Sequence, residues 1–166
     1  MKYVKPLALF RDLLKAKANG GRLLGLDVGD KYVGLAISEL DNKIASPLGV
    51  LMRKQSNIND MASDFQTLIS QLSLAGFVVG YPFDRQKTSP TAVQVKLLID
   101  DLNKTEKLDD IQYTFWDESF TSKNAELLIK PLDLPPVEAK SIVDKYAALG
   151  ILQAYLDYFN RNRTTQ

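Results

Sequence analysis

The sequence predicts an α/β domain built on a mixed β-sheet with helices on its faces. Residues 22–52 contain three strand-like segments separated by short turns, a pattern typical of sequential antiparallel strands. Further along, the apolar runs 76–80 and 111–116 alternate with helical patterns, which is typical of parallel strands joined by helices. We therefore expect a five-stranded sheet, with three antiparallel strands followed by parallel strands, flanked by helices.

A short helix is predicted ahead of the sheet. Apolar residues recur with helical spacing in residues 6–17, and Gly20-Gly21 ends the pattern. Six basic residues and one acidic residue give residues 1–22 a net charge of +5, which could contact phosphates or simply face solvent. We divide the chain into a basic helical N-terminal extension (1–21), a single domain (22–160) and a tail (161–166).

The first hairpin carries the first candidate functional residue. Side chains alternate between two faces along residues 22–28, and Asp27 shares its face with Gly25 and Gly29. A buried carboxylate loses hydration, so Asp27 must be paired, hydrogen-bonded or bound to a cation, and we expect the glycines to leave space for an ion or ligand. Two alternatives remain open: Asp27 could cap its own turn, or the hairpin could bind phosphate as in actin-like ATPases.

Strands and helices alternate over the rest of the chain. The third strand, over 43–52, contains Pro47, which favours a sheet edge or a bulge. Ser89 followed by Pro90 is typical of a helix N-terminus. The later predicted elements are a helix over 59–72, a strand over 76–80, a helix over 89–103, a strand over 111–116, and helices over 122–130 and 137–158.

Composition narrows the possible chemistry. The 166 residues include no cysteine and no histidine, which excludes disulfides, zinc held by these residues, cysteine nucleophiles and Ser-His-Asp triads. Any acid-base or metal chemistry must then rest on carboxylates, lysine, tyrosine or water. Sites made only of oxygen ligands suit Mg²⁺ and Mn²⁺. The net charge of +1 gives no global sign of nucleic-acid binding. No apolar run could span a membrane, and we expect a cytoplasmic protein, with organelle targeting left open by the basic leader.

Two further acids occupy positions like that of Asp27. Glu118 follows the strand over 111–116, and sites in open α/β sheets gather at the carboxyl ends of strands. Asp144 lies on the same helix face as Ala147 and Ala148 and should point inward, although it could instead be the buried partner of a lysine or a backbone amide. Three converging acids repel one another unless cations lie between them, which favours one or two Mg²⁺ ions able to support phosphodiester hydrolysis.

Four motifs occur in a fixed order along residues 22–157: Asp27-Val-Gly-Asp-Lys-Tyr-Val-Gly-Leu-Ala, Val78-Val-Gly-Tyr-Pro, Trp116-Asp-Glu-Ser-Phe-Thr-Ser and Asp144-Lys-Tyr-Ala-Ala-Leu-Gly-Ile-Leu-Gln. Together they resemble the YqgF family, and the Tyr81-Pro-Phe-Asp-Arg stretch is closest to plant-type members. This family is RNase H-like and is described as Holliday junction resolvases and, in bacteria, as nucleases that mature the 5′ end of small-subunit ribosomal RNA. The resemblance implies an RNase H-like fold and nuclease activity.

The resemblance also implies a site. The acidic triad of the family falls on Asp27, Glu118 and Asp144, which would be catalytic and hold Mg²⁺ or Mn²⁺, with Asp27 bridging two ions. Residues 80–90 would form a loop over the site, or simply a solvated turn. The residues implied to contact the phosphates of the nucleic acid are Lys31, Arg85, Lys87, Thr121 and Ser122.

Two departures from the bacterial pattern concern the substrate. Tyr32 and Ser119 stand where bacterial members usually have arginine, so two cations are missing, and Asp30 adds a carboxylate. Phosphate contacts dominate nucleic-acid affinity, so these changes bear on substrate strength and identity more than on the fold.

We expect a metal-dependent endonuclease acting on structured nucleic acid, with ribosomal RNA precursor processing preferred on family analogy. The alternatives are a Holliday junction resolvase on branched DNA, a non-catalytic nucleic-acid-binding module and an actin-like ATP-binding domain. Junction resolution would call for a symmetric homodimer, for which the sequence identifies no face.

Overall fold

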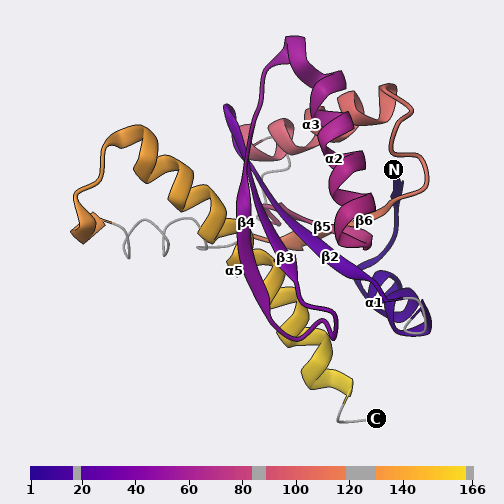
Figure 1. Cartoon of the computed structure of the whole chain (residues 1–166). Helices are drawn as coiled ribbons and strands as arrows, with labels where there is room; N and C mark the ends of the chain where they lie inside the picture. Colours follow the sequence, from indigo (N-terminus) through magenta and orange to yellow (C-terminus); the bar gives the residue numbers. More distant parts are fainter. Residues whose placement is uncertain (17–19, 84–88, 119–129, 164–166) are drawn as a thin grey trace.

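The computed structural model describes residues 1–16, 20–83, 89–118 and 130–163 (Figure 1). Its centre is a six-stranded sheet with strand order β1-β6-β5-β2-β3-β4. The strands are β1 (Lys2–Tyr3), β2 (Arg22–Val28), β3 (Tyr32–Ser38), β4 (Ala45–Met52), β5 (Leu74–Tyr81) and β6 (Gln112–Asp117). The α-helices are α1 (Pro6–Lys15), α2 (Ile58–Leu72), α3 (Pro90–Lys104) and α5 (Pro136–Arg163), and two 3₁₀ turns cover Gln55–Asn57 and Lys130–Leu132.

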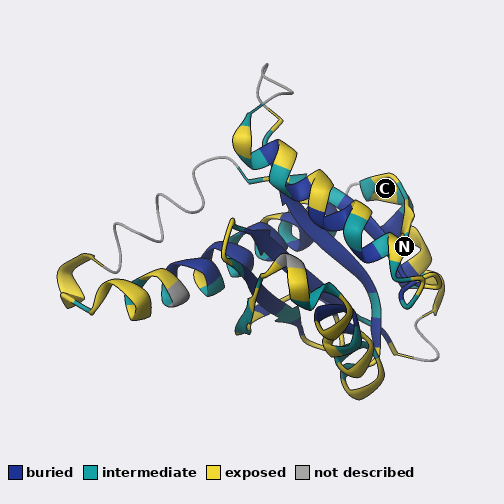
Figure 2. Cartoon of the chain, turned by 90° about the horizontal axis from the view of Figure 1, so that it is seen from above, coloured by how far each residue is buried: buried dark blue, intermediate teal, exposed yellow. Residues whose placement is uncertain are grey.

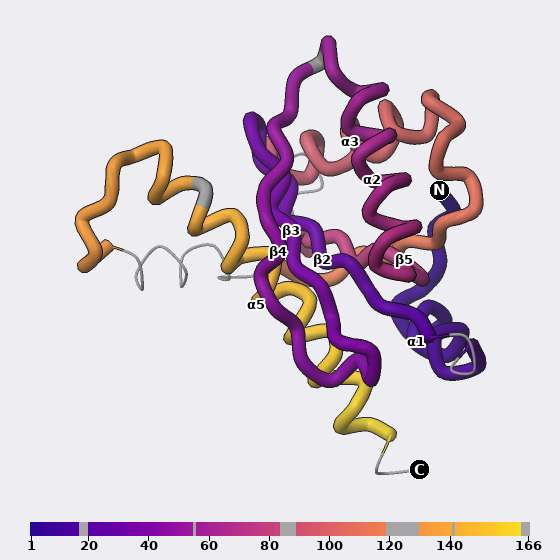
Figure 3. Tube along the Cα trace, in the orientation of Figure 1, coloured from indigo at the N-terminus to yellow at the C-terminus, as the bar shows by residue number. Residues whose placement is uncertain are grey.

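The sheet has the predicted mixed topology. Strands β2, β3 and β4 pair antiparallel, whereas β2, β5 and β6 pair parallel, as the helical connections require. Figure 3 shows the three antiparallel strands running side by side. The described sheet has one strand more than the five predicted, because Lys2 and Tyr3 pair with Gln112 and Tyr113 to form β1. Two residues are too few to show a period in the sequence.

Helices cover both faces of the sheet. Leu24, Leu26 and Val28 pack with α2 and α3 in one core, and Leu23 packs with α1 and α5 in the other. This division confirms the predicted alternation along β2. Figure 2 shows the buried strands lying between the two helical layers. Asp27 has the same parity as Leu23, so it lies on the α5 face.

Helix α1 belongs to the same core as α5. Leu9, Phe10 and Leu13 are buried against the side chains of α5, and the hydroxyl of Tyr155 donates a hydrogen bond of 2.7 Å to the carbonyl of Pro6. The basic N-terminal segment therefore contributes apolar packing as well as charge. In the described part of the chain, no helix has the length and apolarity needed to cross a membrane.

The last helix lies unusually close to the sheet. A Cβ placed on Gly25 would lie 2.7 Å from the Cβ of Leu152, and one on Gly80 would overlap with Ile151. Glycine at these positions therefore lets the apolar stripe of α5 rest almost on the backbone of β2 and β5. The first turn of α5 projects beyond the sheet and is mostly exposed (Figures 1 and 2).

Candidate active site

Asp27 lies near the end of β2, under α5, with 8% of its surface exposed. The pKa of Asp27 is raised to about 7, first by burial and then by the charges of Asp144 and Glu118, while the charge of Lys140 acts in the opposite direction. Burial favours the neutral carboxyl group, and neighbouring carboxylates add repulsion. The other two predicted acids therefore lie close enough to Asp27 to act on its charge.

Gly34 positions Asp144 opposite Asp27. Gly34 pairs with Asp27 across β2 and β3, and the backbone of Asp144 lies directly on Gly34. A Cβ on Gly34 would overlap with the carbonyl group of Asp144. The sequence analysis missed this role, for which the available signal was a glycine in the middle of a strand, a pattern that often marks a close backbone approach.

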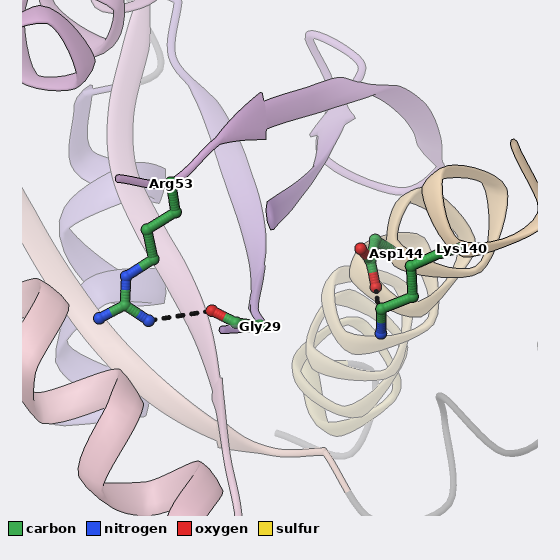
Figure 4. A network of polar contacts seen from close by, with 4 residues as sticks. All are labelled: Gly29, Arg53, Lys140 and Asp144. Carbon is green, nitrogen blue, oxygen red and sulfur yellow. Dashed lines mark hydrogen bonds and ion pairs between the residues drawn. The ribbon is translucent and has the colours of Figure 1, made fainter. Parts of the chain in front are cut away.

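Asp144 is almost completely buried, with 2% of its side chain exposed, and its two oxygens have different surroundings. Oδ1 lies 3.2 Å from Nζ of Lys140, one helical turn earlier in α5 (Figure 4). Oδ2 has no hydrogen-bond partner among the described residues. The alternative of a lysine partner is thus met for one oxygen, whereas the described part of the chain gives the other oxygen none of the compensation that a buried carboxylate needs.

The electrostatics of Asp144 follow from this arrangement. Burial raises the pKa of Asp144 above its ordinary value, the charge and hydrogen bond of Lys140 oppose the rise, and the charge of Asp30 adds to it. Asp30 itself is exposed in the turn between β2 and β3. Repulsion among the acids therefore extends from the buried site to the hairpin turn.

Glu118 follows β6 and is half-buried. Its backbone N–H donates a hydrogen bond of 3.2 Å to the carbonyl of Tyr81, which fixes Glu118 at the carboxyl edge of the sheet. Within the described ranges, no group of three or more acidic side chains is arranged to hold a metal ion. The structure thus brings Asp27 and Asp144 together and places Glu118 within electrostatic reach.

The donor set nevertheless suits a hard divalent cation. The side chains at these three positions offer only carboxylate oxygens as ligands, and Mg²⁺ and Mn²⁺ prefer such ligands. The buried Oδ2 of Asp144 is an acceptor with no described donor. A cation there would offset the repulsion among the carboxylates and would also serve as the partner of Oδ2.

The remaining predicted contact residues divide into two groups. Lys31 is exposed in the turn after β2, and its carbonyl accepts a hydrogen bond of 2.7 Å from the backbone N–H of Arg53. The others lie outside the described residues: Arg85, Lys87, Thr121 and Ser122.

The expected space beside Gly25 is not free. Helix α5 fills it, since the side chain of Leu152 and the carbonyl of Ala148 lie where a Cβ on Gly25 would be. At Gly29 the nearest atom to such a Cβ is the carbonyl oxygen of Tyr32 in its own turn, at 3.0 Å. The expectation that these glycines make room for an ion or ligand was therefore wrong for Gly25, because its missing side chain makes room for the helix that carries Asp144.

Arg53 supports the hairpin turn and was not predicted. Its Nη1 donates a hydrogen bond of 2.9 Å to the carbonyl of Gly29 (Figure 4). Its Nη2 donates one of 3.2 Å to the carbonyl of Gln94 in α3. The turn after Asp27 is also closed by the backbone N–H of Gly29 donating to Tyr32. A single arginine after a strand carries no periodic signal, so only the three-dimensional structure identifies this contact.

A mixed sheet in this order, with acids at its carboxyl edge, defines an RNase H-like fold of the RuvC type. The solved structure of Thermus thermophilus RuvC in complex with a Holliday junction substrate matches 84% of this chain and 96% of its own, with a TM-score of 0.53 and 11% sequence identity. A second T. thermophilus RuvC structure also matches 84% of this chain and 96% of its own, with a TM-score of 0.51. At this identity the likeness establishes the fold alone.

Sequence comparison establishes the family. The model of the RuvX family, described as Holliday junction resolvase, matches residues 21–158. A Caldanaerobacter subterraneus subsp. tengcongensis protein is 36% identical over 137 residues, which cover 82% of this chain and 96% of the relative. A Rhodobacter capsulatus protein is 34% identical over 147 residues, which cover 88% of this chain and 89% of the relative. Both relatives carry the provisional name pre-16S rRNA nuclease. The chain belongs to the RuvX (YqgF) family, which confirms the resemblance in its motifs.

Proposed function

We propose that this chain is a metal-dependent endonuclease that hydrolyses phosphodiester bonds in ribosomal RNA precursors, at the 5′ end of the small-subunit RNA. The observation that carries the proposal is the placement of Asp27 and Asp144 as buried carboxylates on facing elements, with Glu118 near enough to raise the pKa of Asp27. Such repulsion costs stability, and a bound divalent cation offsets it.

In this proposal Asp27, Glu118 and Asp144 hold the divalent cation, Mg²⁺ or Mn²⁺. The cation would supply charge that activates water and stabilises the leaving oxygen. Lys31 contacts a phosphate from the turn after β2, and Arg85, Lys87, Thr121 and Ser122 add further contacts to the nucleic acid. The proposed site would hold one or two such ions.

The choice of RNA rests on the relatives. Proteins 34–36% identical to this chain are named for pre-16S rRNA, whereas the RuvC structure bound to junction DNA shares 11% of its sequence. The description of the family model keeps Holliday junction resolution as a second candidate, for which a homodimer would be needed. A cytoplasmic location stays a prediction.

The test compares three substrates with one purified protein. An RNA that joins the 5′ flank to the mature small-subunit RNA, a synthetic four-way DNA junction and ATP are each incubated with Mg²⁺, with Mn²⁺ and with a chelator. We expect metal-dependent cleavage of the RNA, lost in Asp27→Asn and retained in Asp64→Asn, which removes the same charge from an exposed position on α2. Cleavage of the junction alone would select the second candidate, and cleavage of neither nucleic acid would contradict the nuclease proposal.

A further inference from the structure

Lys140 is a cation within the acidic site that the proposed reaction does not use. Its Nζ lies 3.2 Å from Oδ1 of Asp144, and the two residues stand four positions apart on α5. The side chain of Lys140 is 50% exposed, whereas that of Asp144 is 2% exposed. One ammonium group at the surface therefore compensates a carboxylate that is closed off from water.

The acids around Lys140 lie on α5, on β2 and in the turn after β2. Burial by itself would lower the pKa of Lys140, but the charge and hydrogen bond of Asp144, together with the charges of Asp27 and Asp30, raise it above its ordinary value. The charge of Lys140 also opposes the rise in the pKa of Asp27, which burial and the neighbouring acids cause. The ammonium group thus acts on the same carboxylates that a divalent cation would neutralise.

This pair differs from an ordinary surface ion pair. Lys104 and Asp101 on α3 lie 3.7 Å apart with 78% and 37% of their side chains exposed, and exposed pairs of this kind contribute little. Removing Lys140 instead leaves a buried carboxylate without its cation, which is costly. The Lys104–Asp101 pair is an exposed contact of neighbouring residues on a helix, whereas the Lys140–Asp144 pair compensates a buried charge.

The side chain of Lys140 can also move away from Asp144 without disturbing the core. It is exposed and lies in the first turns of α5, where most residues are exposed. Its long side chain reaches Oδ1 of Asp144 from the solvent side, so a cation bound to the same carboxylate would compete with the ammonium group for its negative charge, and Lys140 could swing away while α5 stays in place. The freed ammonium group would lie at the rim of the site, where a nucleic-acid phosphate would approach.

We propose that Lys140 is the resident cation of the acidic site, which compensates Asp144 in the metal-free protein and competes with a divalent cation for its carboxylate. Lys140 is in this sense a positioning residue and not a catalytic one. The inference rests on the proposed function insofar as it assumes that the three acids bind a divalent cation.

The metal-free half of the proposal is tested by a double-mutant cycle. Thermal midpoints are measured in chelator at pH 8 for the unaltered protein, Lys140→Met, Asp144→Asn and the double variant. We expect Lys140→Met to lower the midpoint when Asp144 is present and to leave it unchanged in the Asp144→Asn background. Equal shifts in both backgrounds would overturn compensation of Asp144 by Lys140.

Competition is tested by calorimetric titration with Mn²⁺ in the absence of nucleic acid. We expect Lys140→Met to bind Mn²⁺ about fivefold more tightly or better, within the usual range of coupled sites. Lys140→Arg, which keeps the charge, and Lys104→Met, which removes a charge from an exposed pair on α3, should bind like the unaltered protein. Unchanged or weaker binding by Lys140→Met would overturn competition and leave the proposed metal site intact. If the unaltered protein does not bind Mn²⁺, the proposed metal site fails as well.

Discussion

The ionised form of Asp27 lowers the stability of the metal-free protein, although the proposed activity requires that form. In the unfolded chain a carboxyl group of this type titrates near pH 3.8, whereas in the folded protein the pKa of Asp27 is about 7. The folded state therefore binds this proton more tightly, and the stability that the proton provides is present below pH 4 and is lost as pH rises to 7. The carboxylate that the proposed metal would need is therefore the form that destabilises the metal-free protein.

Replacing Asp27 by asparagine should therefore stabilise the metal-free protein at pH 8. We expect the free energy of unfolding in chelator to rise by on the order of a few kcal/mol at pH 8, with little change at pH 4, because the neutral amide removes the buried charge. Urea unfolding at both pH values measures this. Asp64→Asn, at an exposed position on α2, should change neither value. A variant that loses stability equally at both pH values would contradict the raised pKa of Asp27.

Sequence reasoning reached these acids because burial follows periodicity. The alternation along β2 placed Asp27 on the face opposite Leu24 and Leu26, and helical spacing placed Asp144 on the buried stripe of α5. The spacing of Lys140 and Asp144 was also visible in the sequence, since residues four apart are neighbours on a helix. That Oδ2 of Asp144 has no partner among the residues the structure describes was not predictable, because this depends on every group that surrounds the buried carboxylate.

At the scale of elements, the contact of α5 with β3 determines where Asp144 lies. Gly34 has no side chain to hold α5 away, so the helix backbone at Asp144 rests on the strand beside Asp27. The glycine in this position is therefore a structural requirement of the acid pair. The contact joins elements far apart in the chain, and sequence alone gives no way to know which helix meets which glycine.

Gly34→Ala should displace α5 from the sheet. The added methyl group would overlap with the carbonyl of Asp144, and overpacking of this kind costs about 1–3 kcal/mol of unfolding free energy. We also expect slower metal-dependent cleavage, because Asp144 moves with the helix backbone. Urea unfolding and the RNA cleavage assay measure the two effects.

The matched control for this change is Gly49→Ala on β4, where a Cβ would meet no atom within 4 Å. It should unfold and cleave like the unaltered protein. If Gly34→Ala kept both stability and activity, the close approach of α5 would not be what positions Asp144.

At the scale of the whole molecule, parallel strands bring distant acids to one edge. The order β6-β5-β2 sets Glu118 two strands away from Asp27, and α5 crosses the sheet to deliver Asp144. The mixture of antiparallel and parallel strands was predictable from the antiparallel meander and the helical crossovers, whereas the order of the strands was not predicted. The exact separation of the three carboxylates was not, since it depends on side-chain conformations and on the cation that would draw them together.

The most direct test of the central claim is a crystal structure of the protein soaked in Mn²⁺, with the ions located by their anomalous scattering. We predict anomalous density between Asp27 and Asp144, within coordination distance of Glu118, and Lys140 released from Asp144. Density elsewhere, or none, with Lys140 still paired to Asp144, would contradict the account, because the three acids would then not form a metal site.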